Sequence, residues 1–207
     1  NFNKAWASSS RYDTIMHFVN NYLDEIDEFE SQLRVPKLSE PLNYRIKLDV
    51  RNAHMGSLPF NGEVRIDIVI KQTTDKIFFH SKNQVINELK VFDKIGGEIK
   101  VLDYSLQTAA DSLTIYFMNE LPAGTQIYVE IKYSTRLLTG STGFYRTFYT
   151  QAGDTKYLAA TQFQPSSARY AFPHYDEPGY KTPFELSITH HQSFHAIANT
   201  FGIEFPK

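Results

Sequence analysis

The sequence contains no cysteine among its 207 residues. This absence excludes disulfide bonds, thiolate metal ligands and a cysteine nucleophile, although a domain of this size can bury a core without cross-links. No run of 18 apolar residues occurs, so we expect no segment of this chain to span a bilayer. The N-x-[ST] sequon for N-glycosylation is also absent.

Charge of either sign is not in excess, with 21 basic and 23 acidic residues and a formal net charge of −2. Neither nucleic acid nor an anionic membrane surface is therefore an expected partner. Aromatic residues are abundant at 14%, including 16 Phe and 13 Tyr, which favours strands. The length fits one domain with an extension. Because the chain begins with Asn1 rather than Met, we expect it to be processed or to be part of a longer chain.

Residues 1–33 predict an N-terminal extension that carries an amphipathic helix over 12–33. Its apolar positions recur at spacings of three and four: Tyr12, Met16, Val19, Leu23, Ile26 and Leu33. Acidic residues occupy the other face: Asp24, Glu25, Asp27 and Glu28. The apolar stripe could dock on the rest of the chain or form a coiled coil; its length of about three heptads favours docking.

From residue 34 onward the apolar period changes to two, which predicts a mostly β domain over 34–207. We expect strands over residues 44–50, 60–70, 77–80, 86–93, 98–106, 112–118 and 126–134. Short strands at near-regular spacing indicate an antiparallel β-sandwich or saddle. His80 ends a buried strand and is typical of a hydrogen-bonded core histidine.

The stretch Thr161–Pro178 reads T-Q-F-Q-P-S-S-A-R-Y-A-F-P-H-Y-D-E-P. Its three prolines exclude a continuous helix, so we expect an extended arm followed by a turned loop. Gln162 and Gln164 are two positions apart and would point to one side of such an arm, where their amides could bind a peptide end. The alternative is a surface loop pinned by aromatics. Arg169 and Asp176 read as an ion pair or cap that holds the loop.

This stretch resembles the T-Q-x-[EQ]-x-x-x-A-R-x-x-F-P-C-x-D-E-P signature of the aminopeptidase N-like zinc metalloproteases, the gluzincin aminopeptidases, and we call it the signature segment. The matching positions include Arg169, Pro173, Asp176, Glu177 and Pro178. One position departs, because His174 stands where the family has Cys. The opening R-V-P-K-L-S-E-P-L-N-Y-R-I, the run F-N-G-E-V-R-I and the loop G-F-Y-R resemble the family as well. Together the resemblance covers residues 34 to about 200.

The resemblance implies the N-terminal β-domain of a zinc aminopeptidase, which removes N-terminal residues from peptides. By resemblance, Gln164 approaches the substrate α-amino group and Gln162 lines the first side-chain pocket. The family's H-E-x-x-H and G-x-M-E-N motifs do not occur here. We therefore expect no catalytic residue, metal ligand or cofactor in this chain, and zinc in a catalytic domain that it lacks. Expected partners are peptide N-termini, that missing domain, other protein chains or further copies of this one.

His191 and His195 have the spacing of two zinc ligands, but Gln192 stands where a catalytic Glu is needed. Such ligation requires a helix, whereas the flanks Phe184–Thr189 and Ala196–Asn199 alternate like strands and the family has a hairpin here. A zinc site there is disfavoured. In the family more strands follow, so we expect the domain to be incomplete at its C-terminal end. The rival function is a truncated, non-catalytic paralogue that binds protein. We expect an extracellular or cell-surface location, with the cytoplasm as the alternative.

Overall fold

The computed structural model describes residues 34–56 and 58–203. The chain divides into two compact units, Asn1–Pro36 and Lys37–Lys207. The helix expected over 12–33 lies outside the described residues.

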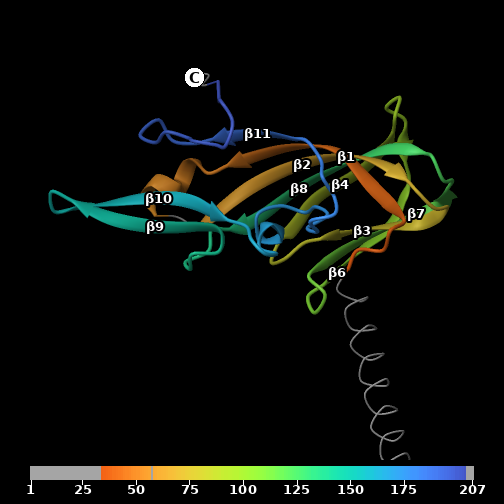
Figure 1. Ribbon diagram of the computed structural model, residues 1–207, viewed down its shortest axis with the longest axis horizontal. Helices are drawn as coiled ribbons and strands as arrows, with labels where there is room; N and C mark the ends of the chain where they lie inside the picture. The colour runs from red at the N-terminus through yellow and green to blue at the C-terminus, as the bar shows by residue number, and fades with distance from the viewer. Residues whose placement is uncertain (1–33, 57, 204–207) are drawn as a thin grey trace, which may run out of the picture. The chain divides into compact units, whose positions relative to one another are not determined.

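A six-stranded sheet contains most of the predicted strands, in the order β11-β1-β2-β8-β4-β5 (Figure 1). Its strands are β1 (Ser39–Asp49), β2 (Pro59–Ile70), β4 (Val85–Asp93), β5 (Glu98–Ile99), β8 (Gln126–Arg136) and β11 (Phe184–Thr189). Every pairing in it is antiparallel except that of β1 with β11, which is parallel. The mostly β, mainly antiparallel prediction is therefore confirmed.

A three-stranded sheet, β3-β7-β6, forms a second layer beneath one end of the first (Figure 1). It consists of β3 (Thr74–His80), β6 (Val101–Gln107) and β7 (Ser112–Leu121). The single strand expected over 98–106 is therefore wrong: β5 and β6 lie in different sheets on either side of Lys100. A period-two pattern reports alternation along the chain, and it does not show where the chain leaves one sheet for another.

A two-stranded hairpin extends away from both layers (Figure 1). Its strands are β9 (Gly143–Gln151) and β10 (Asp154–Gln162), and it is followed by the short 3-10 helix η2 (Ala168–Tyr170). A second 3-10 helix, η1 (Arg51–Met55), follows β1. The residues that we compared with a family loop, from Gly143 onward, are therefore in a strand.

The core is built from the alternating apolar residues that the sequence shows. On β2, Val64, Ile66, Ile68 and Ile70 are fully buried, and β8 matches them with Val129, Ile131 and Tyr133. The second layer contributes Ile77 and Phe79 from β3 and Leu113 and Ile115 from β7. This two-layer core is the support on which the signature segment lies.

Candidate functional site

The signature segment begins at the end of the hairpin. Gln162 is the last residue of β10 and pairs with Gly143 of β9. Gln164 comes two residues after the strand, so the period-two argument for a shared side does not extend to it. Both side chains are exposed. The start of the segment is thus open to solvent.

The rest of the segment is bound to the second layer through its backbone. His80 and His174 exchange backbone hydrogen bonds of 2.8 and 3.1 Å in an isolated antiparallel bridge. The Arg169 carbonyl accepts from the Lys82 amide at 3.0 Å and from Gln84 Nε2 at 3.1 Å. These bonds fix the loop at two separate points, because they involve the end of β3 and the turn that follows it.

Buried tyrosines bind the same loop from the first layer. The Tyr133 hydroxyl donates to the Ala171 carbonyl at 2.7 Å, and the Tyr175 amide donates to the Tyr44 hydroxyl at 3.2 Å. The Tyr175 hydroxyl lies 2.6 Å from Ser39 Oγ. Burial raises the pKa of Tyr44, Tyr133 and Tyr175 well above its usual value, so these hydroxyls stay neutral.

Five charged or titratable side chains meet where the loop touches two turns. We call Lys82, Asp111, Arg169, His174 and Asp176 the charge cluster. Arg169 Nε donates to Asp176 Oδ2 at 2.9 Å, and Lys82 Nζ donates to Asp111 Oδ2 at 2.8 Å. Arg169 Nη1 lies 3.8 Å from Asp111 Oδ2, and His174 Nε2 lies 3.4 Å from Asp176 Oδ1. The ion pair that the sequence analysis favoured for Arg169 and Asp176 is therefore present.

The carboxyl of Asp176 has an unusually low pKa. Burial alone would raise that pKa, but the hydrogen bonds and charges of His174 and Arg169 lower it to about 2. Asp176 also ties the loop to β3, since its backbone amide donates to His80 Nδ1 at 3.1 Å. His80 is therefore a buried, hydrogen-bonded histidine, as its position in the sequence predicted.

Sequence reasoning missed two members of the charge cluster, Lys82 and Asp111. Both come from turns far from the signature segment in the chain, and no local pattern marks them. Among the other signature positions, Pro173 is buried, Glu177 is half-buried and Pro178 is exposed.

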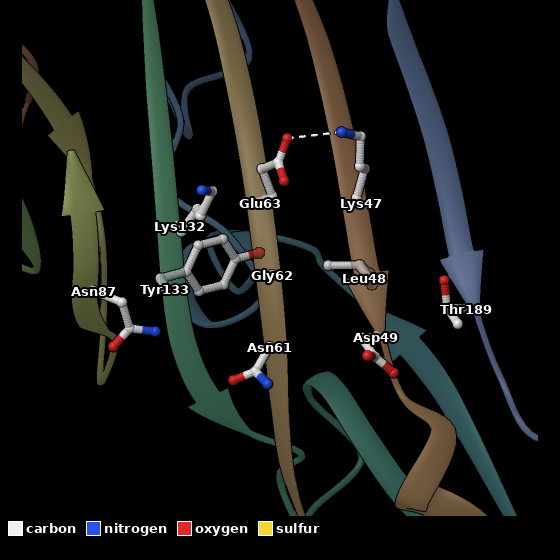
Figure 2. Close-up of a pocket in the computed structure, with 10 residues that line it drawn as sticks. All are labelled: Lys47, Leu48, Asp49, Asn61, Gly62, Glu63, Asn87, Lys132, Tyr133 and Thr189. Carbon is white, nitrogen blue, oxygen red and sulfur yellow. Dashed lines mark hydrogen bonds and ion pairs between the residues drawn. The ribbon is translucent and has the colours of Figure 1, made fainter. Parts of the chain in front are cut away.

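A separate hollow of about 360 Å³ lies on the outer, polar face of the six-stranded sheet (Figure 2). Lys47 and Glu63 line it and form an ion pair of 2.7 Å across β1 and β2. Lys132 also lines it and pairs with Glu88 at 2.5 Å. Because charges of both signs already neutralise one another here, this face suits contact with water better than a charged ligand.

The family model of the peptidase M1 N-terminal domain matches residues 40–205 of the chain. This chain is an N-terminal domain of the M1 aminopeptidases. The match includes the whole signature segment, the charge cluster and every strand, except for Ser39, the first residue of β1. The resemblance drawn from the sequence is therefore confirmed.

Relatives of the M1 N-terminal domain are longer proteins. This chain is 30% identical over 170 residues to the thyrotropin-releasing hormone-degrading ectoenzyme of Mus musculus. The aligned region covers 82% of this chain and 16% of the relative. This chain is 32% identical over 170 residues to the puromycin-sensitive aminopeptidase of Caenorhabditis elegans, and the aligned region covers 80% of this chain and 17% of that relative. This chain is 32% identical over 177 residues to endoplasmic reticulum aminopeptidase 1 of Rattus norvegicus, and the aligned region covers 82% of this chain and 18% of that relative. The chain thus spans under a fifth of the length of these curated relatives.

The described side chains of this domain do not fit zinc, on which M1 enzymes depend. Across residues 34–56 and 58–203, no three His, Asp or Glu side chains are grouped to hold a metal ion. His191 begins a turn, in which the Phe194 amide donates to the His191 carbonyl at 2.9 Å, and His195 follows this turn; neither histidine is on a helix.

The region around His191 also corrects one expectation of the sequence analysis. β11 forms over Phe184–Thr189 as predicted, but Ala196–Asn199 is not a strand, and the described residues after Thr189 contain none. The hairpin expected there is therefore wrong. β11 remains at the edge of its sheet, where no described strand pairs with its outer side. No helix in the described part of the M1 N-terminal domain is both long and apolar enough to cross a membrane.

Proposed function

We propose that this M1 N-terminal domain is the substrate-facing part of a zinc-dependent aminopeptidase that removes N-terminal residues from peptides. The observation that supports this proposal is a contrast within the signature segment. Residues Ala171–Tyr175 are buried, whereas Gln162 and Gln164 are exposed. The two exposed amides at the start of an anchored loop are accessible to a substrate, whereas the buried residues of the segment are not.

Amide side chains suit the binding of a peptide N-terminus. An α-ammonium group donates hydrogen bonds, and the Gln164 carbonyl oxygen can accept one without adding a negative charge. Carboxylates on the zinc-carrying part would supply the remaining acceptors. Metal-assisted hydrolysis would take place there, and the role of this domain would be to bind and orient the peptide.

The hairpin supplies a surface for that zinc-carrying part. A two-stranded ribbon is marginally stable by itself in water, yet Phe148 and Tyr149 are 63% and 49% exposed. As neighbours on one strand, they point to opposite faces of the ribbon. Covering both faces would stabilise the hairpin and would bring Gln162, at its base, next to the partner. The matched relatives are long enough to contain such a part.

The first test uses the chain as it stands and its coding sequence. We expect no turnover of aminoacyl chromogenic substrates by the 207-residue chain with added zinc, because the described residues include no zinc site. We expect the coding sequence to continue into an H-E-x-x-H motif. Zinc-dependent turnover that survives purification and disappears in His191→Ala would overturn the assignment of zinc to another domain.

Gln164→Ala should lower kcat/KM of the assembled enzyme by roughly tenfold, about the loss of one hydrogen bond to a charged group. The melting temperature should hardly change, because the side chain is exposed. Gln151→Ala, an exposed amide at the far end of β9, is the matched control and should leave kinetics unchanged. Lost stability with unaltered kinetics would mean that the Gln164 amide serves the fold and not the substrate.

A non-catalytic module that binds protein is the second candidate, and the exposed aromatic residues of the hairpin favour it equally. A stop codon directly after residue 207 would decide for it, with further copies of this chain or another protein as the partner. The relatives' names include an ectoenzyme and endoplasmic reticulum enzymes, so they support more than one compartment. An extracellular or cell-surface location stays a prediction.

A further inference from the structure

We propose that Arg146 is a positioning residue, which clamps the β9–β10 hairpin onto η1 and so fixes the direction in which the hairpin leaves the β-layers. Arg146 is half-buried on β9, opposite Ala159 of β10. The use of this direction rests on the proposed function, in which the hairpin supplies a surface for the zinc-carrying part. The clamp itself is a property of the domain and is argued from its contacts.

Arg146 makes three described contacts, two of them to segments outside the hairpin. Its Nη1 donates a hydrogen bond to the carbonyl of Gly56, the residue that ends η1. Its backbone amide donates to the Leu138 carbonyl at 2.8 Å. Its Cζ lies 5.0 Å from the centroid of the Tyr157 ring on β10, within the range of a cation–π interaction. One side chain therefore connects η1 with both strands of the hairpin.

The backbone of Gly56 allows this close contact. Its φ of +74° lies in the left-handed region that glycine adopts without strain, and its amide donates to the Ala53 carbonyl at 2.9 Å. A Cβ at residue 56 would lie 2.9 Å from Arg146 Nη1 and 3.1 Å from Tyr157 Cζ. Because residue 56 has no side chain, the end of η1 can lie against β10 (Figure 1).

Among the described contacts between the hairpin and the rest of the domain, this clamp is the outermost. Nearer the base, Phe144 packs edge-on against Phe60 of β2 with ring centroids 5.3 Å apart. Beyond the clamp, residues 148–156 are all exposed. Tyr157 also meets the exposed Phe148 ring edge-on, with centroids 6.5 Å apart. A ribbon held only at its base can swing, so Arg146 fixes where the exposed half of the hairpin points.

Pulsed electron paramagnetic resonance on the 207-residue chain measures this direction, and the absence of cysteine means that spin labels attach only to introduced cysteines. Thr155→Cys on β10 and Val85→Cys on β4 place labels at exposed positions of the hairpin and the six-stranded sheet. We expect one narrow distance distribution. Arg146→Ala should at least roughly double its width, because an isolated hairpin is only marginally ordered. Arg136→Ala removes an exposed arginine at the end of β8 and, as the matched control, should leave the width unchanged.

Two further variants separate the clamp from simple packing. Arg146→Lys keeps a cation that can donate to the Gly56 carbonyl and should retain most of the narrow distribution. Arg146→Met fills similar space without a donor and should broaden the distribution as Arg146→Ala does. Equal widths for these two variants would overturn the clamp. If Arg146→Ala does not fold, Tyr157→Leu tests the same contact from β10, and an unchanged width there would overturn it as well.

Kinetics of the assembled enzyme connect the clamp with the proposed function. Arg146→Ala should lower kcat/KM roughly tenfold, because misplaced binding groups lose the advantage of orientation, and Arg146→Lys should recover most of this loss. A broadened distribution with unaltered kinetics would support the clamp and contradict the proposed role of the hairpin. An unchanged distribution in Arg146→Ala would overturn the clamp whatever the kinetics are.

Discussion

Gly62→Ala is expected to lower the free energy of unfolding by about 3 kcal/mol, a large effect for the addition of one methyl group. Gly62 is buried on β2, where the Tyr133 ring reaches across from β8 (Figure 2). A Cβ at Gly62 would overlap Cζ and the hydroxyl oxygen of Tyr133 and would lie 2.7 Å from Cε1. The glycine is required here by this close approach.

The Tyr133 ring cannot move away from residue 62 without losing a buried hydrogen bond. Tyr133 is fully buried and its hydroxyl binds the Ala171 carbonyl of the signature segment. Displacing the ring would leave that buried carbonyl without its partner, which adds to the cost of overpacking. The melting temperature should fall by roughly 10 °C, since 1 kcal/mol corresponds to about 2–4 °C in a chain of this size.

Denaturant unfolding of two further variants checks this mechanism. Gly179→Ala is the matched control, because a Cβ there meets no atom within 4 Å. It should change stability by less than about 0.5 kcal/mol. In a Tyr133→Ala background, the ring is gone and Gly62→Ala should cost much less, which a double-mutant cycle measures. Equal stability of the Gly62 and Gly179 variants would contradict the prediction.

The sequence predicted the strands well where one face of each is buried. Val64 to Ile70 on β2 and Ile127 to Tyr133 on β8 alternate without interruption, and their period is enough to place them. The sequence did not predict those features of the fold that depend on contacts between residues far apart in the chain. The β5–β6 break at Lys100 and the parallel pairing of β11 with β1 leave no mark on local periodicity.

In the candidate site, too, residues within one continuous motif could be predicted and residues from distant parts of the chain could not. Gln162, Gln164, Arg169 and Asp176 could be selected because they stand in one continuous motif. Lys82 and Asp111 could not, because they join the cluster only when the turns after β3 and before β7 fold against the loop. Tyr133 reads as a core aromatic in the sequence, and only its hydroxyl bond to Ala171 connects it with the segment.

Asp176→Asn should destabilise the domain by about 3 kcal/mol at pH 7, because it leaves the largely buried Arg169 guanidinium without its carboxylate. Asparagine keeps the shape and one acceptor oxygen, so the change removes the charge. Asp154→Asn on β10 is the control: that carboxylate is 76% exposed and lies 3.7 Å from Lys156. An exposed pair of this kind contributes at most about 1 kcal/mol.

Acid titration of stability distinguishes the charge of Asp176 from its shape. The folded pKa of about 2 lies below the usual value of 3.8, so the folded state favours the ionised carboxylate. Its contribution, about 2 kcal/mol from that difference, is complete above pH 4 and is lost as the pH falls toward 2. The stability difference between wild type and Asp176→Asn, measured by denaturant unfolding, should therefore narrow by about that amount between pH 4.5 and 2. A difference that stays constant would show that Asp176 acts through its hydrogen-bond geometry, and that its charge does not hold the signature segment in place.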